Sequence, residues 1–121
     1  MSKILDKKIC ISACPGDSNV SLLASELAEK IGEKDGVRFV KLTDELEQDS
    51  KMVKEEAKNA KEWILIDGCQ RACGMDAFKE AGIVPDHYFV ITDLGIERKN
   101  DTNYTKEEFE TVQSIVNKVI R

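Results

Sequence analysis

Short apolar runs alternate with helical segments along this chain, and this alternation limits its fold more than any other feature. Runs typical of strands occupy residues 8–13, 37–42, 63–66 and 87–92. The run from Trp63 to Ile66 is apolar at every position, which is typical of a strand that is buried on both faces. We therefore predict four strands, each followed by a helix.

Capping residues and glycines mark the helices between these runs. One helix ends at Gly32, a second spans about residues 50–60, a third runs from Cys69 to Ala81, and a fourth starts at Thr105. The first helix shows helical spacing of its apolar residues Leu23, Leu27 and Ile31. Thr105 and Glu108 form a capping box at the start of the last.

A βαβαβαβα order predicts an α/β fold, a three-layer sandwich with a mostly parallel four-stranded sheet and helices on both faces. Right-handed crossovers restrict the topology, and we expect the Rossmann-like strand order 2-1-3-4. A length of 121 residues fits one domain, residues 1–121. Domains of this size bury enough surface to fold without a metal ion.

The formal net charge of -5 argues against a nucleic-acid partner, because such binding needs a basic surface. It argues equally against binding to an anionic membrane. The N-terminal residues lack the apolar stretch of a signal peptide, and no run reaches the length of a transmembrane helix. We therefore expect a cytoplasmic protein with no membrane partner.

Four cysteines in a cytoplasmic chain indicate metal binding or catalysis more than a disulfide framework. In open α/β sheets, sites form beyond the carboxyl ends of the strands, where the strand order reverses. Cys14 follows the first strand and Cys69 follows the third, so the predicted strand order makes their loops neighbours. Each loop also opens a helix, whose positive N-terminal end favours a thiolate.

Cys69 and Cys73 are spaced i, i+4, which would put both on one face of the third helix. With Cys14 as a third ligand, these thiolates predict a zinc site. The fourth ligand stays open among Cys10, Asp17 and water. Cys10 would lie about 13 Å from Cys14 in an extended strand, so we interpret it as a buried structural cysteine.

Three segments together resemble the DGC-domain family of bacterial and archaeal proteins. The central one reads Ile66-Asp67-Gly68-Cys69-Gln70-Arg71-Ala72-Cys73. The first is Cys14-Pro15-Gly16-Asp17-Ser18-Asn19-Val20, and the last is Thr92-Asp93-Leu94-Gly95-Ile96. The resemblance implies zinc binding by cysteines. Many members carry a second cysteine where this chain has Asp17, a departure that bears on the fourth ligand.

Other functions compete with the zinc interpretation. Cys69 could act as a nucleophile that Cys73 resolves, in a thiol-redox or sulfur-carrier protein. An open zinc position beside Asp67 or Asp93 would suit a metal-dependent hydrolase. Phosphate-loop, dinucleotide, serine-hydrolase and zinc-protease motifs are absent, so the sequence assigns no reaction. His87 is expected at the opposite end of the sheet, in a structural role.

Overall fold

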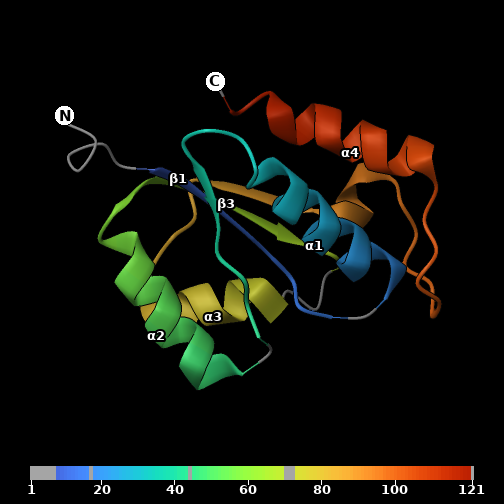
Figure 1. The fold of residues 1–121 in the computed structure, drawn as a ribbon. Helices are drawn as coiled ribbons and strands as arrows, with labels where there is room; N and C mark the ends of the chain where they lie inside the picture. Colours follow the sequence, from blue (N-terminus) through green and yellow to red (C-terminus); the bar gives the residue numbers. More distant parts are fainter. Residues whose placement is uncertain (1–7, 17, 44, 70–72, 121) are drawn as a thin grey trace.

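The computed structural model describes residues 8–16, 18–43, 45–69 and 73–120. Its elements follow the predicted order (Figure 1): β1 Lys8–Ala13, α1 Asn19–Ile31, β2 Val37–Phe39, α2 Leu46–Ala57, β3 Ala60–Asp67, α3 Cys73–Ala81, β4 His87–Val90, the 3-10 helix η2 Ile91–Leu94, and α4 Lys106–Asn117. No helix among the described residues is long and apolar enough to cross a membrane.

The four strands form one parallel sheet in the order β2-β1-β3-β4, which confirms the predicted fold class and topology. Helices α1 and α4 cover one face of the sheet, and α2 and α3 cover the other (Figure 1). The result is a three-layer sandwich. The strand order reverses between β1 and β3, as expected.

Side chains of β1 alternate between the two cores. Ile9, Ile11 and Ala13 face the α1–α4 core, whereas Cys10 lies in the α2–α3 core. Ser12 lies on the same side as Cys10, where its hydroxyl donates to the Val40 carbonyl at 2.6 Å and accepts from the Trp63 indole. The pleat therefore sends Cys10 into an apolar core.

The first three strands and helices differ from prediction mainly at their ends. Strand β2 stops at Phe39. The carbonyl of the next residue, Val40, accepts a hydrogen bond from the Ser12 side chain and not from a backbone N–H group. Helix α2 begins at Leu46, earlier than expected. Its Asp49 is buried and accepts bonds from the Thr43 backbone N–H and hydroxyl, which anchors the first turn.

The last strand is also shorter than predicted. β4 ends at Val90, and η2 follows it. The backbone N–H of Thr92 donates to the Gly68 carbonyl at 3.2 Å, so the chain turns toward the loop after β3. Gly95 ends η2 with a φ of +94°, a conformation that favours glycine. The capping box of Thr105 and Glu108 at α4 is confirmed.

Candidate functional site

The loops after β1 and β3 meet at the carboxyl edge of the sheet. The Cys14 backbone N–H donates to the Ile66 carbonyl at 2.9 Å, which extends the β1–β3 ladder past the end of β1. A Cβ on Gly68 would lie 2.8 Å from the backbone nitrogen of Ser21 in the first turn of α1. This confirms the prediction that the loops after β1 and β3, which carry Cys14 and Cys69, are neighbours.

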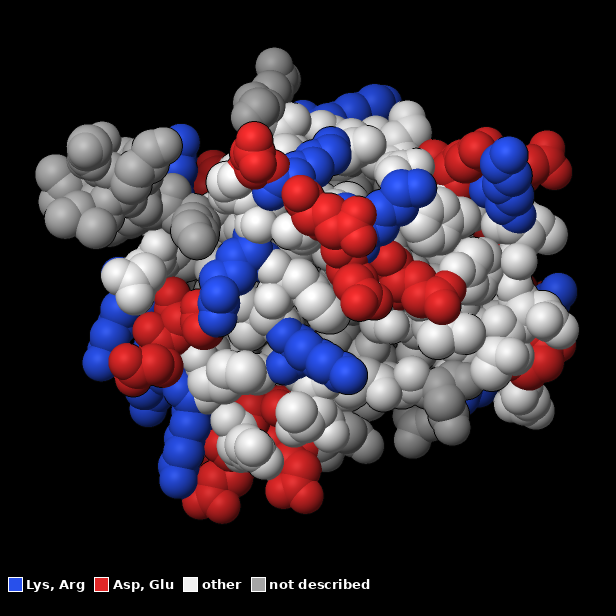
Figure 2. Space-filling view, viewed as in Figure 1, with Lys and Arg blue, Asp and Glu red and all other residues white. Residues whose placement is uncertain are grey.

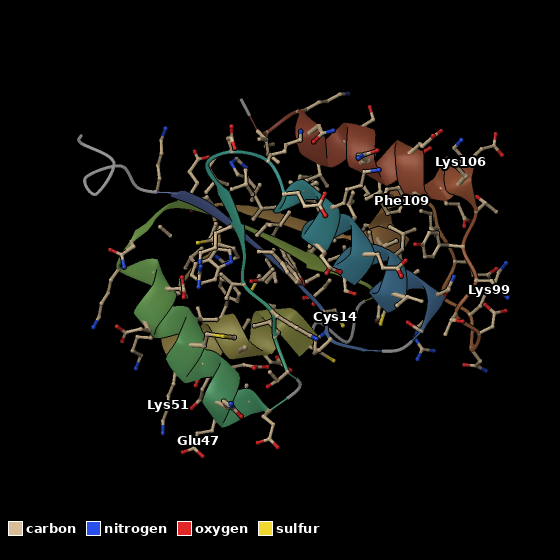
Figure 3. All side chains as sticks on the ribbon, in the orientation of Figure 1. Cys14, Glu47, Lys51, Lys99, Lys106 and Phe109 are labelled. Atoms are coloured by element: carbon tan, nitrogen blue, oxygen red, sulfur yellow. The ribbon has the colours of Figure 1, made fainter. Side chains whose placement is uncertain are left out.

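Cys14 is buried at the end of β1, where Figure 3 labels it. Its Sγ atom lies 3.4 Å from the Ser21 hydroxyl, and either group can donate. The hydroxyl of Ser18, the N-cap of α1, lies 3.1 Å from the same Ser21 oxygen and accepts the Ser21 backbone N–H. The thiol is therefore held against the hydroxyl pair that caps α1.

Cys69 and Cys73 do not share a helical face, so that expectation is wrong. Cys69 lies in a bend after β3 and packs against the α1–α4 core. Cys73 is the first described residue of α3 and lines a cavity of about 130 Å³ together with Asp49 of α2. Residues 70–72, between the two cysteines, fall outside the described residues.

Asp67 sets the start of α3. Its buried carboxylate accepts the backbone N–H groups of Gly74 at 2.8 Å and Met75 at 3.1 Å, and the Tyr88 hydroxyl at 2.7 Å. Asp67, at the end of β3, therefore caps the first described turn of α3. Gly74 leaves room for this contact, since a Cβ there would lie 2.7 Å from Asp67 Oδ1.

Burial raises the pKa values of both Asp67 and Tyr88. Desolvation raises the pKa of the Asp67 carboxyl above its ordinary 3.8, although the bonds from Tyr88, Gly74 and Met75 act in the opposite direction. Burial and the adjacent Asp67 carboxylate also raise the pKa of Tyr88. Sequence reasoning missed Tyr88, because the partner of a strand residue across the sheet carries no local signal.

Asn19 ties the segment just after the third motif to the start of α1. Its buried amide donates to the Glu97 carbonyl at 2.9 Å and accepts the Lys99 backbone N–H at 2.7 Å. The described residues offer no hydrogen-bond partner to the buried Thr92 hydroxyl. The Thr92 backbone N–H donates to the Gly68 carbonyl, which places the start of the third motif beside the central one.

The remaining predicted positions lie in the α2–α3 core, in η2, at the start of β4 or outside the described residues. Cys10 is 2% exposed among the apolar side chains of the α2–α3 core. Asp17 falls outside the described residues. Asp93 is exposed in η2. His87 begins β4, at the opposite end of the strands, with its Nε2 atom 3.8 Å from Glu62 Oε1.

The donor set fits zinc in kind, because thiolates are among its preferred ligands. Its arrangement is incomplete: within the part of the chain that the structure describes, no three His, Cys, Asp or Glu side chains lie close enough to hold one ion. None of the four cysteines forms a disulfide in the structure. Acidic and basic side chains are interspersed over the face seen in Figure 2.

The fold and the site define a class: a parallel α/β protein with thiols on the loops at the point where the strand order reverses. The model of the DGC domain matches residues 10–116. The chain therefore belongs to the DGC-domain family, as its three motifs predicted. Searches of the curated proteins and of the solved structures found no match.

Proposed function

We propose that this protein binds a zinc ion through Cys14, Cys69 and Cys73. The observation that carries the proposal is the direct contact between the two loops, through the Cys14–Ile66 hydrogen bond and the close approach of Gly68 to Ser21. Loops that carry thiols from distant parts of the sequence thus meet at one edge of the sheet. The edge is also where open α/β sheets bind ligands.

The ligand types support zinc in particular. Zinc takes thiolate sulfur at about 2.3 Å in tetrahedral sites, and it accepts an oxygen ligand or water as the fourth. Asp17 follows Cys14 closely in the sequence and carries such an oxygen. The Cys10 side chain is buried in the α2–α3 core, so we propose Asp17 or water as the fourth ligand.

Metal content of protein purified without an affinity tag tests this proposal. We expect near-stoichiometric zinc by mass spectrometry, and we expect it to be lost in Cys14→Ser, Cys69→Ser and Cys73→Ser. Cys10→Ser is the matched control, since it removes a thiol from the core and should leave the zinc content unchanged. Zinc-free wild-type protein, or equal loss in all four variants, would contradict the proposal.

The same preparations distinguish the thiol-redox alternative. No disulfide joins any of the four cysteines in the structure, so reduced protein should show four reactive thiols once it is unfolded. Protein without metal, in which Cys69 and Cys73 cycle between thiols and a disulfide, would favour a redox role. A hydrolase with an open zinc position would instead require bound zinc together with turnover that disappears when the zinc is removed.

A further inference from the structure

A second small cavity lies beside Cys14, between α1 and the segment that follows β2. Its volume is about 170 Å³. Its lining residues are Ala13, Cys14, Pro15, Ser25, Glu29, Phe39, Lys41 and Leu42. The cavity therefore sits at the carboxyl ends of β1 and β2, and Pro15 lines both this cavity and the one that Cys73 lines. Neither Cys69 nor Cys73 belongs to its wall.

The wall combines opposite charges with apolar surface. Glu29 and Ser25 lie one helical turn apart on α1, and Lys41 lies on the chain after β2. Among the described residues, no ion pair joins Glu29 to Lys41. Phe39 and Leu42 supply the apolar part. A carboxylate and an ammonium thus both border one cavity without neutralising each other by direct contact.

We propose that this cavity binds a small zwitterion, a free α-amino acid of about the size of alanine. Lys41 recognises the ligand carboxylate, Glu29 recognises its ammonium group, and Ser25 supplies a hydroxyl to either. The volume of about 170 Å³ is that of about six water molecules at the ~30 Å³ each occupies in the liquid. It therefore admits a ligand of about six non-hydrogen atoms, which is the size of alanine.

The test is a titration of the full chain with L-alanine, followed by two-dimensional NMR of the backbone amides. We expect shifts concentrated at the lining residues and saturable binding. Acetate and ethylamine, which each lack one of the two charges, should bind roughly tenfold more weakly or worse, because each loses one charge-assisted hydrogen bond. Shifts that are absent or spread over the whole surface, or equal binding of acetate, would overturn the proposal.

Two variants and two matched controls locate the binding. Lys41→Met and Glu29→Gln should each weaken L-alanine binding by about tenfold, since each removes one charged partner. Both side chains are exposed, so the fold should be kept, and the same spectra verify this. Lys51→Met and Glu47→Gln change the same residue types on α2, away from Cys14 in Figure 3, and should bind like wild type. Equal binding by Lys41→Met and wild type would refute the assignment.

A further variant separates this proposal from the zinc site. Cys69 does not line the cavity, so Cys69→Ser should still bind L-alanine even though the zinc proposal expects it to lose metal. Loss of alanine binding in Cys69→Ser would show that the ligand depends on the metal and would overturn the assignment to Lys41 and Glu29. Retained alanine binding in a zinc-free wild-type protein would refute the zinc proposal alone.

Discussion

Gly68 and Ser21 approach so closely that no side chain fits between them. A Cβ on Gly68 would lie 2.8 Å from the Ser21 backbone nitrogen and 2.9 Å from its hydroxyl oxygen. These contacts are with the first turn of α1, which is anchored by its N-cap and cannot move aside easily. The glycine of the central motif is therefore required by packing between the two thiol-bearing loops.

Gly68→Ala should consequently destabilise the fold. We expect the free energy of unfolding to fall by about 1–3 kcal/mol, the usual cost of forcing extra volume into a packed interior. Urea denaturation followed by circular dichroism measures this. Gly68→Ser adds one more atom and should cost at least as much. If Gly68→Ala unfolded at the same urea concentration as wild type, the loop after β3 would be able to move away from α1.

Tyr88→Phe tests the hydrogen bond that the hydroxyl donates to Asp67 at 2.7 Å. The substitution removes one of the bonds to a buried carboxylate and leaves the ring in place. We expect a loss of about 1–2 kcal/mol in the free energy of unfolding, at the lower end for a bond to a charged group because Tyr88 is partly exposed. Tyr104→Phe is the matched control, because it removes a hydroxyl that donates to Glu26 at an exposed site and should cost less. An unchanged stability would show that water replaces the hydroxyl.

The raised pKa of Asp67 predicts a pH dependence with a definite sign. A group whose pKa is higher in the folded state favours folding at pH values below its ordinary 3.8, and this contribution is lost as the pH rises through the folded-state pKa. Relative to Asp67→Asn, which does not titrate, wild-type protein should therefore lose stability as the pH rises from about 4 toward neutral. Urea denaturation of both proteins across this range measures the difference. A stability difference that is constant, or that grows in favour of wild type with rising pH, would contradict a raised pKa for Asp67.

Asn19→Ala should loosen the segment that follows η2. The substitution leaves the Glu97 carbonyl and the Lys99 N–H without the amide that bonds both. We expect a cost of about 1–3 kcal/mol, and faster hydrogen exchange at the Lys99 amide. Asn19→Asp keeps an acceptor for Lys99 but sets a buried carboxylate oxygen against the Glu97 carbonyl, so it should cost at least as much. Slow exchange at Lys99 in Asn19→Ala would show that other contacts hold this segment.

Thr92→Val removes a buried hydroxyl that has no hydrogen-bond partner among the described residues. Because an unsatisfied buried polar group is costly, the valine variant should be as stable as wild type or up to about 1–2 kcal/mol more stable. Thermal unfolding measures this, with Thr111→Val on the exposed face of α4 as the control. Clear destabilisation would mean that this hydroxyl has a partner outside the described residues.

Much of the fold could be predicted because its determinants are local. The period of apolar residues distinguishes strands from helices, and right-handed crossovers then leave few topologies for a βαβαβαβα chain. The same reasoning placed the loops of Cys14 and Cys69 side by side, and the alternation along β1 agreed with a buried Cys10. The capping box of Thr105 and Glu108 was visible because both partners belong to one helical turn.

The tertiary structure alone decided how the first described turn of α3 is capped and what surrounds each thiol. Asp67, from the end of β3, accepts the N–H groups of Gly74 and Met75, a bond between elements that no periodicity reveals. The sequence by itself determined the strand order and the edge of the sheet at which the thiols lie. It did not determine the faces of Cys69 and Cys73 or the cavity between Glu29 and Lys41, because these depend on packing between segments that are distant in the chain.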